Sequence, residues 1–562
     1  MKLNKTQISG LAVLAIVMVV VWSTRRGPSV DAGRFVAVSG SPAGAYEFDS
    51  MRDYLRGDRP SSDHRVVFVG LDGAAWKIID PMIESGLLPT LGRLKQEGAW
   101  GVLRSVDCYF SPPAWTSMMT GYLPQKTGVY TFGKWMHDER EFSAFSSLDV
   151  AVPFVWDVAS KADRRVAVTN IPMTYPAQPV NGIMVTGLMT PIVYDKTISQ
   201  RRLRFKSTTA AFDVDLDAKS YAPRLVRTLM FSLNTLVFVL YDTVDDQQTR
   251  YDTVALKVFP ATESWTLSDQ APLYTFAPNE YSPWFHLDYR KKQANIRVKK
   301  KVACSVMIEP VAGDSTSAIV KMTPLLRLPS DPDLDLTHPE SLASEIEREF
   351  GYYLITMTYS ADLVPQGTEW TASLASYFYD YDDWDLFLYT FMAPDNIQHH
   401  EGVSERTRAV YQSIDRFLAG LLNKLPDDVT LIVASDHGFS RYDYIISLND
   451  YLEQIGVLTN PRNVDHDSTL VFHNQWCLYF NDDLVTASEL TTRGIAIADG
   501  ETPRQALVAY LKDMCRQLEA AGRPMPVELI EVPEDAVGTA PDMIVVGGYG
   551  DYFIEGMDLS IQ

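Results

Sequence analysis

The stretch RVVFVGLDG at residues 65–73 is a β-branched apolar run that ends at an acidic residue between glycines. Such a run predicts a buried strand, with Asp72 at its carboxyl end. Further along, SPPAWTSMMTG at residues 111–121 begins with a serine followed by two prolines. Ser111 at the N-cap and Pro112 at the first helical position are typical of a helix start. Unpaired N–H groups and the positive end of the helix dipole would favour a phosphate beside Ser111.

Asp72 and Ser111 have both a chemical and a purely structural interpretation. A carboxylate such as Asp72 at the end of a strand can hold a divalent metal ion that makes the Ser111 hydroxyl nucleophilic. In the structural interpretation, Ser111 is only an N-cap and Asp72 is only a turn residue. Taken alone, these short motifs leave both alternatives open, and the downstream sequence decides between them.

Two later apolar runs also end in an acidic residue with a histidine within reach. They read WDLFLYTFMAPDNIQHH at 384–400, with Asp395 and His399, and VTLIVASDHGF at 429–439, with Asp436 and His437. Open α/β sheets bind their ligands at the carboxyl ends of strands. Carboxylate oxygen and imidazole nitrogen are ligands that zinc and manganese accept. Three strand-end acids, two of them with a histidine, therefore predict a metal site.

Six blocks of the sequence, in this order, resemble the alkaline phosphatase superfamily. Within it, the chain is similar to the predicted phosphohydrolase/phosphomutase group that is related to type I phosphodiesterases and nucleotide pyrophosphatases. The blocks lie at residues 66–105, 111–132, 171–191, 393–400, 405–439 and 447–458. The resemblance is thinner after residue 480 and between about 200 and 335. It implies an α/β fold, with a largely parallel sheet covered by helices on both faces.

The resemblance also implies a role for each candidate site residue. Ser111 matches the family's nucleophile, which becomes transiently phosphorylated. The ligands of the metal that also holds the Ser111 oxygen would be Asp72, Asp436 and His437, and a second metal would be held by Asp395 and His399. The implied cofactors are two divalent ions, zinc or alternatively manganese. Two such ions clamp an in-line displacement at phosphorus.

The second metal site departs from the family pattern, because relatives supply a third ligand from a histidine near the C-terminus. This sequence has no histidine after His473. A site with fewer ligands binds its ion more weakly. Three explanations remain open: a chain shortened before that histidine, replacement by His466 or His473, or a one-metal or degenerate site. We favour shortening, with His473 as a weak substitute.

Composition supports a large acidic enzyme and argues against nucleic-acid binding. The chain has 562 residues, 46% of them hydrophobic, and a formal net charge of −21 at pH 7. That length predicts a large core and two domains. Nucleic-acid binding through an electrostatic surface requires a basic face, which this charge disfavours. The four cysteines are widely spaced, which excludes a disulfide scaffold and a cysteine-built zinc site but leaves a single bridge open.

The N-terminus reads as a targeting segment. Residues 8–22, ISGLAVLAIVMVVVW, carry no charge and are flanked by basic residues on both sides. We expect residues 1–27 to form an uncleaved signal anchor that spans the membrane, with the catalytic domain outside the cytoplasm, periplasmic or at the cell surface. A cleaved signal peptide and a buried core helix are the alternatives. Residues 28–64, rich in Gly, Ser, Pro and Asp, would form a stalk.

Beyond the stalk, the pattern predicts a catalytic core interrupted by an insertion. Residues 65–199 and 336–562 alternate strand and helix signals, including one helix over about 75–97, and predict the parallel-sheet core. Residues 200–335 carry short alternating runs and predict an antiparallel β-rich insertion. The basic run at 290–301 within it is interpreted as a solvated strand edge protected by lysines rather than an anion site.

Two classes of function follow from these patterns. The first is a metal-dependent phosphohydrolase or phosphodiesterase that acts through a phosphoserine on an unknown phosphoester, either a small molecule or a lipid or glycan. A membrane-anchored transferase of phospho-headgroups on the same fold is the alternative within that chemistry. The second class is a catalytically degenerate, membrane-tethered binding protein. No motif predicts the substrate or the oligomeric state.

Overall fold

The computed structural model describes the chain in separate stretches that belong to two compact units. The described residues are 17–23, 65–195, 199–208, 219–261, 272–293, 296–354, 361–381, 383–426, 429–440, 444–461, 463–520, 527–533, 535–547 and 552–555. Unit 1 comprises Met1–Thr190, Leu336–Pro339 and Val364–Gln562, and unit 2 comprises Pro191–Asp335 and Glu340–Leu363. All residues of the predicted site belong to unit 1.

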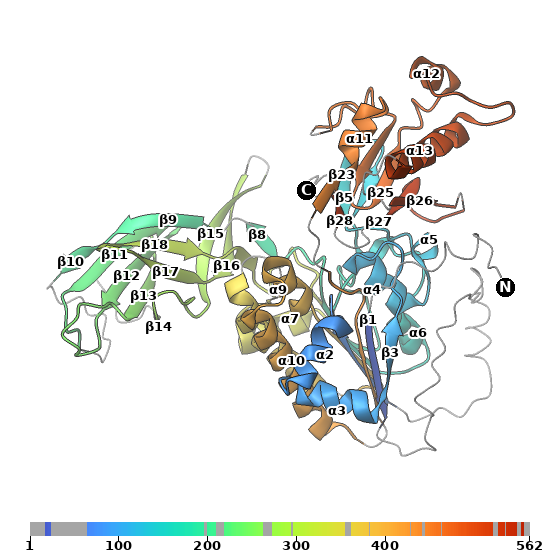
Figure 1. The fold of residues 1–562 in the computed structure, drawn as a ribbon. Helices are drawn as coiled ribbons and strands as arrows, with labels where there is room; N and C mark the ends of the chain where they lie inside the picture. The colour runs from blue at the N-terminus through green and yellow to red at the C-terminus, as the bar shows by residue number, and fades with distance from the viewer. Residues whose placement is uncertain are drawn as a thin grey trace. The chain divides into compact units, whose positions relative to one another are not determined.

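Unit 1 is built on an eight-stranded sheet (Figure 1). The strands, in spatial order, are β20 (Thr337–His338), β7 (Gly182–Thr186), β6 (Val166–Ile171), β21 (Leu386–Phe391), β2 (Arg65–Leu71), β22 (Val429–Ala434), β1 (Val17–Ser23) and β3 (Ala99–Leu103). The five strands from β7 to β22 are parallel, whereas β20, β1 and β3 pair antiparallel. The predicted α/β class is confirmed.

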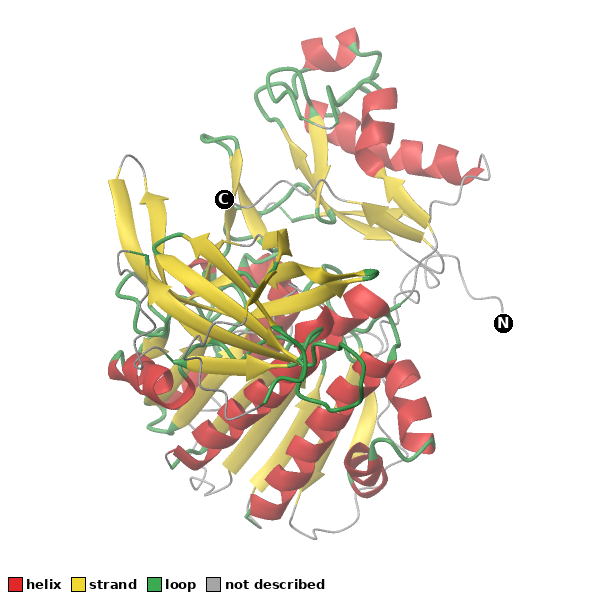
Figure 2. Ribbon diagram, turned by 90° about the vertical axis from the view of Figure 1, so that its left-hand side faces the viewer, coloured by secondary structure: helices red, strands yellow, loops and turns green. Residues whose placement is uncertain are grey.

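Successive strand residues point to opposite sides of this sheet, and helices cover both of its faces (Figure 1). Figure 2 looks onto one of these faces, with long helices lying across the strands. On one face, Phe68 and Leu388 pack in a cluster with residues of α4 (Ser111–Thr120) and α6 (Val155–Lys161). On the other face, Tyr389 and Phe391 contact Phe417 of α10 (Glu405–Lys424). The Tyr389 hydroxyl also donates to the Thr371 carbonyl of α8 (Val364–Tyr381) at 2.6 Å.

The helix expected over about 75–97 is two helices in the structure. They are α2 (Trp76–Glu84) and α3 (Pro89–Glu97). Between them, Gly86 has a φ of 77°, in the left-handed region that favours glycine. Pro89 at the first position then starts α3 in a new direction. The apolar periodicity continues across this break, which explains why the sequence suggested a single helix.

The N-terminal apolar segment differs from the expected membrane helix. Residues 17–23 form strand β1, which pairs with β22 on one side and with β3 on the other. Valine-rich sequence favours an extended strand, and two neighbouring strands supply hydrogen-bond partners for its backbone. Among the described residues, no helix combines the length and apolarity needed to cross a membrane. Residues 1–16 and the expected stalk at 28–64 lie outside the described residues.

Unit 2 is antiparallel β-structure, as the alternating runs predict. It contains three sheets. The first consists of β10 (Lys206–Thr208), β11 (Arg224–Phe231), β12 (Asn234–Tyr241), β13 (Thr253–Pro260) and β14 (Leu273–Phe276), and the second of β15 (Phe285–Gln293), β16 (Ile296–Cys304), β19 (Leu325–Arg327) and β8 (Val193–Asp195). The third consists of β17 (Val306–Val311), β18 (Asp314–Met322) and β9 (Ser199–Arg204). The basic run lies on the β15–β16 hairpin, where Lys300 pairs with Asp331 and Asp333. The helix α7 (Ser341–Phe350) also belongs to this unit.

The C-terminal part of unit 1 has its own small antiparallel sheet and hydrophobic cluster. The sheet contains β24 (Val471–Asn474), β25 (Cys477–Phe480), β27 (Met543–Gly547) and β26 (Val527–Glu531), and the nearby helices are α11 (Leu448–Gln454), α12 (Ala487–Thr492) and α13 (Pro503–Ala520). Cys108, Cys477 and Cys515 are buried in this cluster, and all four cysteines are free thiols. The single bridge that the sequence left open is therefore not formed.

Candidate metal centre

Two strand ends bring acidic residues together in the middle of the sheet. Strands β2 and β22 are parallel neighbours, so the residues that follow them lie at the same edge. Asp72 follows β2, and Asp436 and His437 follow β22. The ligand atoms of these three residues all lie within 4.8 Å of one another, and the three are buried. The predicted ligand set of the first metal is thus assembled, as the strand-end argument expects.

Ser111 lies beside this group, at the start of α4. Its Oγ donates to Asp72 Oδ1 at 3.3 Å and lies 3.3 Å from His437 Nε2. The side chain is 5% exposed, so this hydroxyl is held in a largely enclosed position. Its partners are the carboxylate and the imidazole rather than the helix backbone.

The helix starts one residue away from the predicted position, and this changes how many of its N–H groups could bind a phosphate. Phe110, with extended φ and ψ angles, is the N-cap, and Ser111 is the first helical residue. Pro112 and Pro113 follow it and have no N–H group. The N–H of Ala114 already donates to the Phe110 carbonyl. The helix dipole remains, but of the first four N–H groups only that of Ser111 is left for an anion.

Asp395 and His399 lie one turn apart on α9 (Ala393–Glu401), which follows β21. His399 Nε2 is 3.4 Å from Asp395 Oδ1. A Cβ atom built on Gly73 would lie 2.8 Å from the Asp395 Cβ, so α9 packs against the turn that carries Asp72. The Asp395 charge also acts on the pKa values of Asp72 and Asp436. Both predicted acid–histidine pairs therefore belong to one site.

The electrostatics of the group favour a bound cation. Burial raises the pKa of Asp72 well above its usual range, and the nearby Asp436 and Asp395 charges raise it further. Burial likewise raises the pKa of Asp436 to about 6. Burial opposes the charged form of His437, but Asp436, Asp72 and Asp395 outweigh it and raise its pKa to about 9. Buried carboxylates that repel one another are stabilised by a divalent ion.

The donor atoms fit one metal ion well. Asp72, Ser111, Asp436 and His437 offer three oxygens and one nitrogen, the number that a four-coordinate zinc site takes. Asp436 Oδ2 is buried without a hydrogen-bond donor, 3.3 Å from His437 Nε2. Such an orphaned carboxylate oxygen is expected where a cation completes the site.

The second proposed metal site has fewer candidate ligands among the described residues. Asp395 and His399 are in place, with the His399 side chain 61% exposed and open to solvent. His473 is fully buried in β24, where its backbone N–H and carbonyl bond the Asn449 side chain. His466 packs on the Trp135 ring, 4.8 Å between centroids. Among the described residues, neither His466 nor His473 forms a metal-ligand group with Asp395 and His399.

Trp115 is a site residue that the sequence reasoning missed. Its indole N–H donates to Asp72 Oδ2 at 2.7 Å from the next turn of α4. The ring lies so close to β2 that a Cβ atom on Gly70 would come within 2.4 Å of it. A lone glycine inside a strand is a known sign of such a close approach, and Gly70 was the available signal. Trp115 therefore fixes one oxygen of Asp72 and leaves the other toward Ser111.

Hydrogen bonds of backbone and serine groups also connect the loops that follow β2 and β22. Gly73 N–H donates to Asp436 Oδ1 at 3.2 Å, and Ala74 N–H donates to Ser435 Oγ at 2.9 Å. The Ser105 hydroxyl donates to the Asp436 carbonyl at 2.7 Å. Because these bonds cross between segments far apart in sequence, the loops after β2 and β22 are positioned together.

Comparison with known proteins places this site in a family. Residues 66–265 and 284–555 match the model described as type I phosphodiesterase / nucleotide pyrophosphatase. One similar solved structure is phosphonoacetate hydrolase from Sinorhizobium meliloti 1021 in complex with phosphonoacetate, with 16% identity, a TM-score of 0.38, and coverage of 89% of this chain and 84% of that chain. Another is murine ectonucleotide pyrophosphatase/phosphodiesterase 5, with 12% identity, a TM-score of 0.34, and coverage of 88% and 82%. Curated proteins gave no match.

The family match and the site agree in chemistry. The matched residues include both strand ends, α4 and α9, so they carry every member of the group around Ser111. Because the match spans most of its length, the chain belongs to the type I phosphodiesterase/nucleotide pyrophosphatase family and is a phosphoric ester hydrolase.

Proposed function

We propose that the chain is a metal-dependent phosphohydrolase or phosphodiesterase that uses Ser111 as its nucleophile. One observation carries the proposal. The Ser111 hydroxyl, enclosed at the start of α4, lies 3.3 Å from both Asp72 Oδ1 and His437 Nε2. A serine hydroxyl held against a buried carboxylate and an imidazole is the arrangement expected of an activated nucleophile.

Divalent ions in this site would lower the pKa of the serine hydroxyl and neutralise charge on the phosphoryl group and leaving oxygen. The residues of the chain do the rest. Ser111 Oγ forms a bond to phosphorus while the bond from phosphorus to the leaving alcohol breaks. The hydroxyl proton has a hydrogen-bonded acceptor in Asp72 Oδ1. Water then cleaves the phosphoserine, which restores Ser111 and releases the phosphate product.

The test is a pair of serine variants on the same helix. Ser111→Ala should reduce hydrolysis of p-nitrophenyl phosphate and bis-p-nitrophenyl phosphate to background. The circular dichroism spectrum should stay unchanged and the metal content nearly so, because three of the four proposed donors remain. Ser117→Ala is the matched control, since its hydroxyl is buried on α4 but forms no hydrogen bond. It should keep wild-type turnover. Wild-type turnover by Ser111→Ala would refute the phosphoserine mechanism.

Metal content separates the hydrolase from a degenerate binding protein. By ligand count, one ion should survive dialysis and a second should be lost readily, because Asp395 and His399 alone hold it. Asp436→Asn should remove the retained ion, whereas Asp395→Asn should weaken only the loose one. Elemental analysis after zinc loading measures both. A wild-type protein that retains no zinc and hydrolyses neither ester would instead be a binding protein.

Location outside the cytoplasm stays a prediction that rests on the apolar segment at 8–22. We propose it together with attachment through that segment, although residues 17–23 form a strand of the core sheet. Fractionation of cells that produce the full chain tests it. Protein in the cytoplasmic fraction alone would exclude the proposal.

A further inference from the structure

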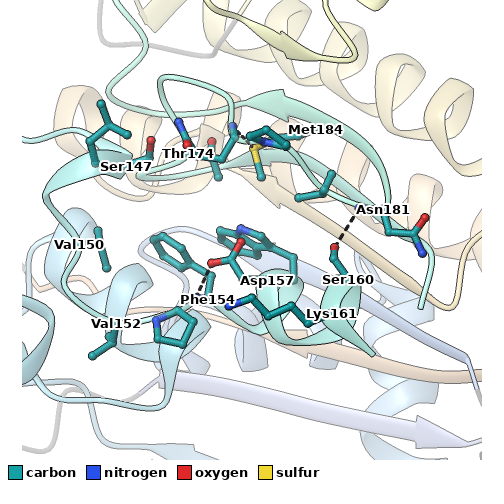
Figure 3. Close-up of a pocket in the computed structure, with 16 residues that line it drawn as sticks. Ser147, Val150, Val152, Phe154, Asp157, Ser160, Lys161, Thr174, Asn181 and Met184 are labelled. Carbon is teal, nitrogen blue, oxygen red and sulfur yellow. Dashed lines mark hydrogen bonds between the residues drawn. The ribbon is translucent and has the colours of Figure 1, made fainter. Parts of the chain in front are cut away.

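A cavity lies in unit 1, and none of the proposed metal ligands lines it. Its volume is about 600 Å³, and two chain segments line it, 147–161 and 174–184 (Figure 3). That volume is in the range of about 300–1,000 Å³ that is typical of small-molecule sites. The second segment belongs to the block at 171–191, which the metal site leaves without a role. None of the proposed metal ligands and no part of α4 or α9 lines the cavity.

Apolar side chains form most of the cavity wall. The rings of Phe154 and Trp156 stack with centroids 4.4 Å apart and planes at 13°. Both rings are buried, as is Met184 of β7, whereas Val150 and Val152 are half-buried. Because Trp156 and Met184 are each only 1% exposed, they support the wall from behind. Phe154 and the branched side chains of Val150 and Val152 offer the accessible surface to a ring or a compact apolar body.

The polar groups at the rim are mostly committed to the fold. Asp157 accepts from the Phe154 N–H at 2.9 Å, and Ser160 Oγ accepts from the Asn181 N–H at 3.0 Å (Figure 3). The Thr174 hydroxyl donates to the Ile171 carbonyl at 2.6 Å. These bonds keep the two segments in place, so the cavity is built by the fold rather than left by loose loops.

Lys161 is the cation of the lining, and its ammonium group is available. Within the described part of the chain it forms no ion pair or hydrogen bond. It lies near Asp157. Burial raises the pKa of Asp157, while the hydrogen bond from the Phe154 N–H and the Lys161 charge act to lower it. Asp157 accepts from the Phe154 N–H and forms no ion pair with Lys161, so the Lys161 ammonium group can approach an incoming anion.

We propose that this cavity binds a small amphipathic anion, with a ring or compact apolar body against Phe154, Val150 and Val152 and one anionic group beside Lys161. A dianion fits less well, since the second charge would face Asp157. The site is separate from the proposed catalytic centre, and binding can be measured on metal-free protein without turnover. Binding in this cavity is therefore independent of the proposed hydrolysis.

The test uses 1-anilinonaphthalene-8-sulfonate, which combines an aromatic body with a single anion and fluoresces when its surroundings are apolar. The full chain should bind one molecule saturably. Lys161→Met should weaken binding about tenfold, the loss expected for a hydrogen-bonded charge. Val152→Trp should weaken binding by placing an indole ring in the cavity. Lys512→Met, on α13 and paired with Glu531, is the matched control and should bind normally.

Two results would overturn the proposal. Binding of several dye molecules that neither variant alters would show adsorption to other apolar surface. Unchanged affinity in Lys161→Met would remove the assigned anion contact. Because Lys161 is exposed, its substitution is expected to fold normally even where Val152→Trp does not, and thermal unfolding of each variant checks this.

Discussion

At the scale of single residues, Trp115 ties the fold to the chemistry. It packs on Phe68 of β2 and donates its N–H to Asp72, so the same side chain fills the core and orients a proposed ligand. Trp115→Phe would keep the ring contact but remove the hydrogen bond. We expect zinc affinity to fall by about 10–100-fold, the usual effect of losing a partner of a metal ligand. Calorimetric titration of zinc into the variant measures it.

The control for this prediction is Trp156→Phe, which changes a buried tryptophan of the same cluster that has no bond to the site. Equal zinc affinity in both variants and the wild type would show that the indole bond is immaterial. The sequence predicts some of the site residues but not others. Asp72, Ser111, Asp436 and His437 follow from local patterns, whereas Trp115 depends on how closely α4 approaches β2.

At the scale of elements, the strand ends were predictable because each buried strand is a short apolar run with an acid within four residues of its end. The limits of the helices were less predictable. The turn at Gly86 divides one expected helix into two, and the N-cap of α4 is Phe110 rather than Ser111. Strand β1 could not be predicted, because an apolar valine-rich segment suits a membrane helix as well as a strand. In the structure, residues 17–23 pair with β22 and β3, both distant in sequence, and a local pattern cannot show such pairing.

Deletion of residues 1–23 tests that assignment. In the structure Val19 is paired with Ala434, so the deletion would remove one of the two neighbours of β22, the strand before Asp436, and leave only β2. We expect a lower unfolding temperature, at about 1 kcal/mol of stability for each net ladder hydrogen bond lost. Deletion of residues 1–16 is the control and keeps β1. A soluble, equally stable and equally active product of the longer deletion would support the membrane-anchor prediction instead.

At the scale of the whole molecule, the proposed metal site and the inserted β-structure belong to different units. Every proposed metal ligand belongs to unit 1, whereas the antiparallel strands of unit 2 enclose a hydrophobic cluster of their own, with Phe238 and Val302 among its members. Each unit therefore has the buried apolar surface that cooperative unfolding requires. The insertion was predictable from its change of periodicity, because alternating runs without long helices are characteristic of antiparallel strands.

This separation predicts that metal stabilises only part of the molecule. In scanning calorimetry of the full chain we expect two transitions, and zinc should raise only the one that belongs to unit 1. At a free zinc concentration one hundred times the dissociation constant, the added stability is about 2.7 kcal/mol. Asp436→Asn should lose that shift and keep the zinc-independent transition of unit 2 unchanged. A single transition that zinc moves as a whole would mean that the two units unfold together, because binding energy gained in one would then stabilise both.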